Sequence, residues 1–342
     1  VLQAGRGGAE EGGPLNTEQA IKLIAKAKTP ADLFADDKDG AFRRLAKLVH
    51  PDVVSHRMKA SAHEAFTKLN RLYTEMNGKA EPFSAIKIGP WIVKGPLAKG
   101  EIADLYEVTS NEHEEAAFKI VRMAKDNDLM GAEAESLKRL WKPASTDNFK
   151  KYLPQIFDSF KASGRQANVL ELASKHHRSL ADILSQYPNG LDFRHVVWMT
   201  NRLLAILGYA HRQGIVHGAI LPEHLLYQTE DHGLMLTDWC YSVEIGKPMR
   251  AVAKLRKSHY PPEVLKKRAV GPGTDIYLMA KTMLLAAERV PTRFRALLEE
   301  WCLVESAGAR PQDAWVLQER WETLARAEYG PPKYVRLEMA AH

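Results

Sequence analysis

The chain has 342 residues, of which 45% are hydrophobic and 26% charged, and its net charge is +6. These are ordinary globular values, and the length suffices for two or three domains. Two cysteines, Cys240 and Cys302, exclude a disulfide framework and a cysteine-based metal cluster. With neither a bilayer-length apolar run nor a signal-peptide pattern, we expect a soluble cytoplasmic protein that makes no membrane contact. The charge permits acidic partners but does not point to nucleic acid.

The N-terminal part reads as a tail followed by a helix. Residues 1–14 are rich in glycine and nearly free of apolar side chains, so we expect a disordered tail. A first helix is expected from Glu18 to Lys28, with Thr17 or Asn16 as its cap. The next stretch, 29–38, reads as irregular.

Two amphipathic helices follow, separated by His50-Pro51-Asp52. The first is expected over 39–49, and the proline after it ends the helix because it disfavours a helical residue before it. The second begins after this loop. Its apolar residues fall on one face, which predicts a helical hairpin with a shared seam: Ala62, Ala65, Phe66, Leu69, Leu72, Tyr73 and Met76.

This combination resembles a J-domain of the DnaJ family, which we place over 15–78. The resemblance rests on RRLAKLVHPD, ending at Asp52, followed by EAFTKLNRLYTEM. It implies that His50, Pro51 and Asp52 stimulate a DnaK-type chaperone ATPase. The basic side chains before this loop would steer the helix to an acidic chaperone surface: Arg43, Arg44 and Lys47. The alternative is a solvated helix face and a plain turn.

After a linker over 79–87, the pattern changes from helices to strands. WIVKGPLAKGEIADLYEV predicts two strands joined by a small-residue turn, and AAFKIVR a third strand that carries Lys119. A helix is expected over 127–140, with further strands at 155–160 and 168–172.

Further along, the stretch from Ile215 to Cys240 predicts two short strands, 225–227 and 234–236. A tight loop precedes the strands, from His217 to Pro222. Asp238 follows the second strand, where an acidic side chain is well placed to hold a metal–phosphate group.

This stretch resembles the catalytic core of a protein kinase, with the frame H-R-D-x-K-P-x-N, two strands, and D-F-G. His217 keeps the first position, whereas Ala219 stands at the catalytic Asp and Leu221 at the catalytic-loop Lys. His224 stands at the metal-binding Asn. Asp238 keeps the metal-binding Asp, so the resemblance makes Asp238, and with it His224, the candidate metal ligands.

The same resemblance assigns the nucleotide-binding parts. Gly100 is the one glycine kept in the phosphate-covering turn, and Lys119 matches the phosphate-binding Lys. Glu133 is the expected partner of Lys119, with Glu135 as the alternative. Residues 170–172, which include Glu171 and Leu172, would form the hinge that meets an adenine.

Later motifs extend the resemblance over about 88–326, with a β-rich N-lobe at 88–172 and an α-rich C-lobe at 173–326. Glu263 matches the Glu of A-P-E and Arg310 its late Arg partner, which predicts a buried ion pair. Asp275 would hold the catalytic-loop backbone. Residues 327–342 form a C-terminal tail that either packs on the lobe or hangs free. The predicted fold is therefore α+β, an all-α helical-hairpin J-domain followed by a two-lobed kinase-like domain.

The segment 246–268 is strongly basic and corresponds to the activation segment of the family. It contains eight Lys and Arg residues against one acid, Glu263. It is suited to docking an acidic client, and the alternative is an ordinary solvated loop.

These replacements predict a pseudokinase, because Ala219 cannot accept a proton and Leu221 cannot neutralise phosphate charge. The surviving Lys119, Glu133 and Asp238 leave binding of ATP with magnesium or manganese open. We therefore interpret the chain as a specialised co-chaperone whose second domain targets a client or senses nucleotide. One alternative is a divergent metal-dependent kinase or nucleotide-transferring enzyme that uses Asp238 and His224. The other is an interaction scaffold that binds no nucleotide.

Overall fold

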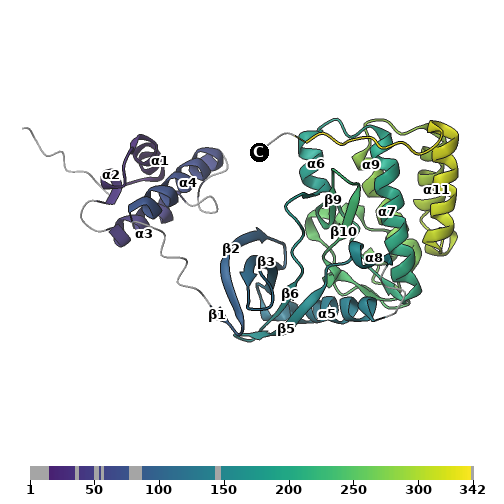
Figure 1. The fold of residues 1–342 in the computed structure, drawn as a ribbon, viewed down its shortest axis with the longest axis horizontal. Coiled ribbons are helices and arrows are strands. Elements are labelled where there is room, and N and C mark those ends of the chain that lie inside the picture. Colours follow the sequence, from purple (N-terminus) through teal and green to yellow (C-terminus); the bar gives the residue numbers. More distant parts are fainter. Residues whose placement is uncertain are drawn as a thin grey trace, which may run out of the picture. The chain divides into compact units, whose positions relative to one another are not determined.

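The computed structural model describes residues 15–34, 38–49, 54, 58–76, 87–142 and 148–339. The chain divides into two compact units, 1–85 and 86–342, which we call unit 1 and unit 2 (Figure 1). The tail predicted over 1–14 and nearly all of the linker predicted over 79–87 lie outside the described residues. Within those residues, no helix is both long and apolar enough to cross a membrane.

Unit 1 begins with helix α1, Thr17–Lys26, whose N-cap is Asn16. The Asn16 side chain accepts a hydrogen bond from the Gln19 N–H at 2.9 Å, and the Gln19 side chain accepts one from the Asn16 N–H at 3.0 Å. This reciprocal pair is a capping box. The helix ends two residues before the predicted end. It stops there because the Asp32 carboxylate accepts a hydrogen bond from the Lys28 N–H at 2.8 Å.

A short helix, α2, Ala31–Phe34, occupies part of the segment that the sequence predicted to be irregular. Phe34 is 1% exposed, and its ring meets Tyr73 edge to face at 5.5 Å. Buried aromatic rings contribute large apolar areas and favour this geometry. The contact therefore holds α2 against the helix that carries Tyr73.

The predicted hairpin helices are α3, Lys38–Val49, and α4, Lys59–Met76. Helices α1, α2, α3 and α4 share one apolar core, formed by Ala20, Ile24, Ala27, Phe34, Leu45, Val49, Ala65, Leu69 and Leu72. The loop residues His50, Pro51 and Asp52 lie outside the described residues.

Unit 2 opens with a six-stranded antiparallel sheet in the order β1-β2-β3-β4-β6-β5. Its strands are β1 Lys87–Ile88, β2 Trp91–Lys99, β3 Ala103–Thr109, β4 Ala116–Val121, β5 Ile156–Ala162 and β6 Arg165–Leu170. Helix α5, Asn127–Trp141, packs against this sheet. Every residue of β4 is buried, so this central strand is enclosed on both faces.

The remainder of unit 2 is mainly helical. Its helices are α6 Leu180–Gln186, α7 Phe193–Arg212, α8 Pro262–Leu265, α9 Pro272–Ala286, α10 Thr292–Ala296 and α11 Ala314–Tyr329. Short strands complete it: β7 His177–Ser179, β8 Ile215–Val216, β9 Leu225–Gln228, β10 Gly233–Leu236 and β11 Val243–Glu244. A sheet-rich part followed by a helical part confirms the two-lobed α+β architecture expected for this region (Figure 1).

The predicted buried ion pair is present in the helical part. Arg310 Nη1 lies 2.7 Å from Glu263 Oε1, and Arg310 is only 2% exposed. The Glu263 carboxylate also accepts a hydrogen bond from the Thr274 hydroxyl at 2.9 Å. Burial opposes ionisation of Glu263, yet the hydrogen bonds from Arg310 keep the pKa of this carboxyl below its ordinary value.

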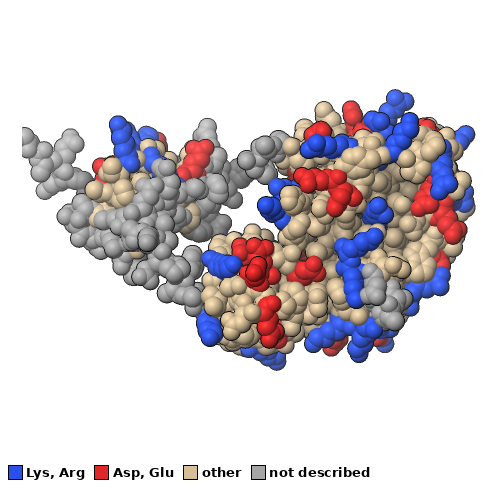
Figure 2. All heavy atoms as spheres, in the orientation of Figure 1, with Lys and Arg blue, Asp and Glu red and all other residues tan. Residues whose placement is uncertain are grey.

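The C-terminal residues pack on unit 2. Helix α11 runs to Tyr329, three residues past the end predicted for the lobe. Beyond it, Leu337 is 3% exposed, and the His232 ring donates from Nε2 to the Val335 carbonyl at 2.9 Å. Figure 2 shows Lys and Arg interspersed with Asp and Glu on the visible face of unit 2, so no field of one sign covers this face.

Candidate functional site

A cavity of about 550 Å³ lies between the sheet and the helical part of unit 2. The turn between β2 and β3 lines one side, the ends of β9 and β10 line the other, and residues 170–173 connect them. Most of the predicted cofactor residues line this cavity: Gly100, Lys119, Glu171, Leu172, His224 and Asp238.

Lys119 on β4 lies at the floor of the cavity between two carboxylates. Its Nζ is 2.7 Å from Glu133 Oε1 and 2.5 Å from Asp238 Oδ1. Asn168 on β6 donates to the other Glu133 oxygen at 3.0 Å. The structure thus pairs Lys119 with Glu133, while the alternative partner, Glu135, is exposed.

Burial alone would lower the pKa of Lys119, but the charges of Asp238 and Glu133 raise it well above its ordinary value. The reciprocal effect acts on Asp238, where burial opposes ionisation and Lys119 nonetheless keeps the pKa of the carboxyl well below its usual range. Lys119 and Asp238 are therefore both charged at neutral pH. A fixed ammonium at the floor of the cavity is suited to pairing with a phosphate.

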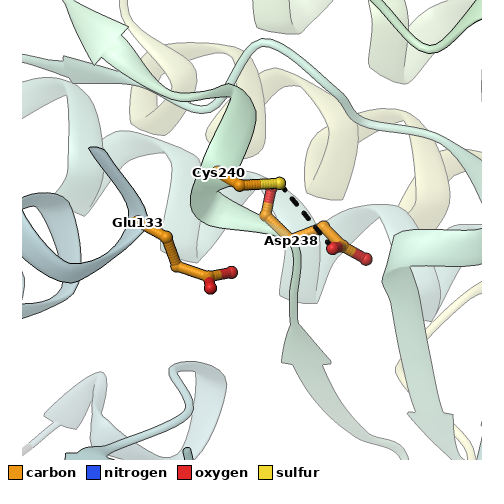
Figure 3. Close-up of side chains that lie close together, drawn as sticks. All are labelled: Glu133, Asp238 and Cys240. Atoms are coloured by element: carbon orange, nitrogen blue, oxygen red, sulfur yellow. Dashed lines mark hydrogen bonds between the residues drawn. The ribbon is translucent and has the colours of Figure 1, made fainter. Parts of the chain in front are cut away.

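Glu133, Asp238 and Cys240 come within 4.8 Å of one another, a spacing that would suit a metal ion (Figure 3). The Lys119 ammonium already contacts this cluster, since its Nζ is 3.8 Å from Cys240 Sγ as well as close to both carboxylates. Burial also raises the pKa of the Cys240 thiol well above its ordinary value, which disfavours the thiolate that metals bind. This cluster is therefore better described as the surroundings of the Lys119 ammonium than as a metal site.

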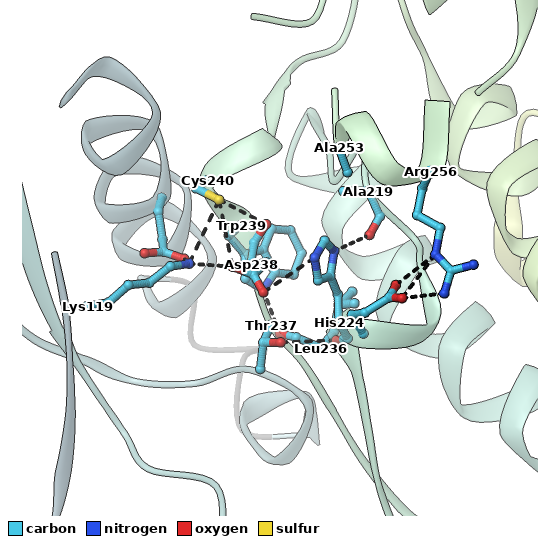
Figure 4. A network of polar contacts seen from close by, with 12 residues as sticks. Lys119, Ala219, His224, Leu236, Thr237, Asp238, Trp239, Cys240, Ala253 and Arg256 are labelled. Carbon is cyan, nitrogen blue, oxygen red and sulfur yellow. Dashed lines mark hydrogen bonds and ion pairs between the residues drawn. The ribbon is translucent and has the colours of Figure 1, made fainter. Parts of the chain in front are cut away.

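His224 and Asp238 form a second pair of potential ligands (Figure 4). His224 Nδ1 is 2.9 Å from the Ala219 carbonyl oxygen, which only accepts, so Nδ1 carries the proton. The other ring nitrogen, Nε2, faces Asp238 and lies 3.5 Å from its Oδ2. One imidazole nitrogen and one carboxylate fit a divalent cation, and nitrogen favours manganese over magnesium.

Asp238, two residues after the end of β10, has a left-handed backbone with φ +61° and ψ 44°. This conformation is uncommon for residues other than glycine, although Asp and Asn tolerate it best. The next residue, Trp239, is fully buried, and its indole donates to the Leu236 carbonyl at 2.8 Å. The buried ring anchors the strained position and aims the carboxylate of Asp238 into the cavity.

The loop before β9 is held by one buried carboxylate, that of Asp275. Its oxygens accept hydrogen bonds from the backbone N–H of His217 and of Gly218, each at 2.8 Å. Ala219 and Leu221, which follow, are buried apolar side chains. The loop is thus built in the form expected from the sequence, but it presents no acid at Ala219 and no amine at Leu221.

His217 gives this loop a dependence on pH. Its Nε2 donates to the Thr237 carbonyl at 2.9 Å, and Nδ1 accepts from the Ala219 N–H at 3.2 Å. Burial lowers the pKa of His217 from 6.5 to about 4. Between these two pH values the imidazole is protonated in the unfolded chain but stays neutral in the folded chain. The unfolding free energy therefore falls as pH drops from 6.5 towards 4.

Between about pH 7 and about pH 4.5, His217 should cost the wild type about 2–3 kcal/mol of unfolding free energy. We expect His217→Phe to remove this part of the pH dependence. The measurement is urea unfolding of both proteins at the two pH values. The variant loses hydrogen bonds and is less stable at neutral pH, but its stability should change less with pH. Equal pH dependence in both proteins would contradict the assignment of a neutral buried ring.

Two contacts close the mouth of the cavity and were not foreseen from the sequence. The Glu101 carboxylate accepts hydrogen bonds from the Lys254 N–H at 2.9 and 3.1 Å. Glu223 pairs with Arg256, whose Nε lies 3.0 Å from Glu223 Oε1. Both join the basic segment 246–268 to residues around the cavity. Spacing along the chain gives no signal for pairs so far apart.

The predicted hinge, residues 170–172, would bind an adenine through its backbone groups. The Glu171 N–H donates to the Gln155 carbonyl at 2.7 Å, so this N–H is already used within the fold. The Glu171 side chain accepts from the Gln155 N–H at 3.1 Å. Glu171 and Leu172 line the cavity, and their part in binding an adenine stays a prediction.

In unit 1, α3 presents the predicted basic residues only in part. Arg44 and Lys47 are exposed on this helix, whereas the side chain of Arg43 is outside the described residues. The role of these residues in binding a chaperone stays a prediction.

Comparison with known proteins shows which protein family unit 2 resembles. The family model described as protein kinase domain matches residues 91–294, more than half of the chain. Serine/threonine-protein kinase D of Synechocystis sp. is 22% identical over 225 residues, which cover 57% of this chain and 43% of that protein. Calcium/calmodulin-dependent protein kinase type 1 of Macrobrachium nipponense is 24% identical over 199 residues, covering 55% and 53%. The chain thus spans about half the length of these relatives.

Among solved structures, the PknI kinase domain of Mycobacterium tuberculosis aligns with a TM-score of 0.56 at 15% identity. The alignment covers 70% of this chain and 98% of that one, a likeness that establishes the fold. The match of the protein kinase domain model to residues 91–294 decides the family. The chain therefore belongs to the protein kinase domain family.

Proposed function

We propose that unit 2 is a pseudokinase that binds a nucleotide with a divalent cation and does not transfer phosphate to protein. The observation that carries this proposal is the buried contact of Lys119 with both Glu133 and Asp238, together with the apolar side chain at Ala219. Lys119 would pair with phosphate oxygens, and Asp238 with His224 would hold the cation. The cation, when bound, neutralises phosphate charge. Ala219 cannot take a proton from an attacking hydroxyl.

We expect ATP with manganese to stabilise unit 2, and Asp238→Asn to abolish this effect. A ligand at 100 times its dissociation constant adds about 2.7 kcal/mol, a shift of several degrees in Tm. Asn suits the left-handed backbone at this position, so the variant should fold. The measurement is a thermal scan with manganese or magnesium, with and without ATP. Absence of any shift in the wild type would contradict the proposal.

The rival enzymatic function draws on His224 Nε2, which faces Asp238 Oδ2 at 3.5 Å. A divergent kinase using these ligands would turn over ATP in a metal-dependent manner. Release of labelled phosphate by the wild type, lost in Asp238→Asn, would favour the enzyme. Nucleotide binding without turnover favours the pseudokinase.

We further propose that unit 1 is a J-domain that recruits a DnaK-type ATPase. The exposed Arg44 and Lys47 on α3, and the apolar core shared by α1, α3 and α4, support it. The motif His50-Pro51-Asp52 after α3 would carry the stimulation. Unit 2 would then target a client, and the exposed cations of segment 246–268 fit an acidic one: Lys247, Arg250, Lys254, Lys257, Lys266, Lys267 and Arg268.

We expect the full-length protein to accelerate ATP hydrolysis by a DnaK-type chaperone and His50→Gln to lose this acceleration. The control is His63→Gln, the same substitution within α4, which should retain it. Single-turnover hydrolysis by the chaperone measures the effect. Equal acceleration by wild type and His50→Gln would remove the J-domain assignment while leaving the pseudokinase proposal untouched.

A further inference from the structure

A second cavity, of about 980 Å³, lies in unit 2 and shares no lining residue with the first. Its walls come from α7 and α11, which pack side by side (Figure 1). Its cover is formed by residues 330–336, which we call the C-terminal strap. None of the kinase motifs contributes to it.

The strap is fixed at both ends. At its start, Gly330 has φ +78° and donates its N–H to the Arg326 carbonyl at 2.9 Å. At its far end, the Tyr334 ring stacks on His232 at 4.6 Å, and the His232 ring donates to the Val335 carbonyl at 2.9 Å. Trp198 stacks on the other side of His232, with ring centroids 4.0 Å apart.

Between these anchors the strap contains Pro331 and Pro332, both exposed. Proline fixes its own φ and carries no N–H, so this part is stiff and has no amide donor that needs a partner. A stiff arch held at both ends does not readily collapse onto the helices beneath it. The cavity is therefore preformed, which lowers the entropic cost of binding.

The wall of the cavity is largely apolar. Val197 and Trp198 line it from α7, and Trp321 and Ala325 from α11. The indole N–H of Trp321 already donates to the Val197 carbonyl at 3.0 Å, so it does not need a ligand. Such a wall suits the flat or extended body of an apolar molecule.

The rim of the cavity is cationic. Five Lys or Arg line it against two acids, Asp231 and Glu322. Arg194 is neutralised by Asp192 at 2.8 Å and Arg336 lies 3.6 Å from Glu338. The other three have no carboxylate partner within the described part of the chain: Arg202, Arg326 and Lys333.

Arg202 is the best placed of these. It is half-buried, and its Nε donates to the backbone carbonyl of His232 at 3.3 Å, the residue whose ring anchors the strap. No other described residue accepts a hydrogen bond from its guanidinium, which leaves N–H groups for charge-assisted hydrogen bonds to a ligand. From this arrangement we infer that the strap cavity binds an amphipathic organic anion. The apolar body lies against Trp198 and Trp321, and the anionic group pairs with Arg202.

The test uses two fluorescent probes that share their rings and differ in charge. Anilinonaphthalene sulfonate is the anion, and phenylnaphthylamine lacks the sulfonate. In the full-length protein, Arg202→Gln should weaken binding of the anion about tenfold, the loss of one charge-assisted hydrogen bond, and leave the neutral probe unchanged. The control is Arg268→Gln, which removes the same charge from a residue that does not line the cavity.

A second variant tests the cavity itself. Ala325→Trp places a large side chain in the wall and should reduce binding of both probes, whereas Ala327→Trp, at an exposed position of the same helix, should not. ATP should not displace the anion, because the two cavities are separate. Unchanged affinity in both Arg202→Gln and Ala325→Trp, or displacement by ATP, would overturn the inference.

Discussion

Replacing Arg310 by Met should lower the unfolding free energy of unit 2 by about 3–5 kcal/mol, because it strands a buried carboxylate. Arg310 donates to both oxygens of Glu263, at 2.7 and 3.1 Å. It also satisfies the carbonyls of Val304 at 2.6 Å and Glu305 at 2.9 Å. Its guanidinium lies 4.7 Å from the centre of the Tyr277 ring. One side chain therefore ties together α8, α9 and the loop before α11.

Tryptophan fluorescence during urea unfolding measures this effect, since all seven Trp residues lie in unit 2. The matched control is Arg295→Met, which breaks an exposed pair with Glu299 at 2.8 Å and should cost less than about 1 kcal/mol. Replacing Glu263 by Met together with Arg310 should restore part of the loss, because no unpaired charge then remains buried. A similar, small cost for both single variants would show that the buried pair contributes no more than a surface pair.

The second large effect is expected at Lys119. Lys119→Met leaves Glu133 and Asp238 facing one another without a cation, and removing one partner of a buried charge group costs about 3–5 kcal/mol. The pKa of the Asp238 carboxyl should then rise, because Lys119 no longer offsets the effect of burial. Stability of the variant should therefore recover in part as pH falls, whereas that of the wild type should not.

The measurement is urea unfolding of Lys119→Met at neutral and mildly acidic pH. Lys94→Met serves as control, because Lys94 is exposed and lies 3.9 Å from Glu107. Adding Asp238→Asn to Lys119→Met should recover stability at neutral pH by removing one of the two unpaired charges. A double variant less stable than Lys119→Met would argue against charge repulsion as the cause.

Local sequence determined much of the fold. Local patterns of apolar residues predicted strands β2, β3 and β4 and helices α3 and α5, because these signals depend on neighbours a few residues away. Separate motifs in family order also located Lys119, Asp238, Glu263 and Arg310. Helix α2 was missed because its burial depends on Tyr73, far along the chain.

What only the tertiary structure decided are the contacts between distant segments. It placed Lys119 within 2.7 Å of two carboxylates at once, and it set the proton of His224 through the Ala219 carbonyl. It also folded the C-terminal residues over α7 and α11 into a strap, where the sequence left a packed or a free tail open. The sequence by itself determined which chemical groups the cavity holds and which it lacks. Their distances and charge states depend on loops whose geometry is set by long-range packing, which periodicity and spacing do not encode.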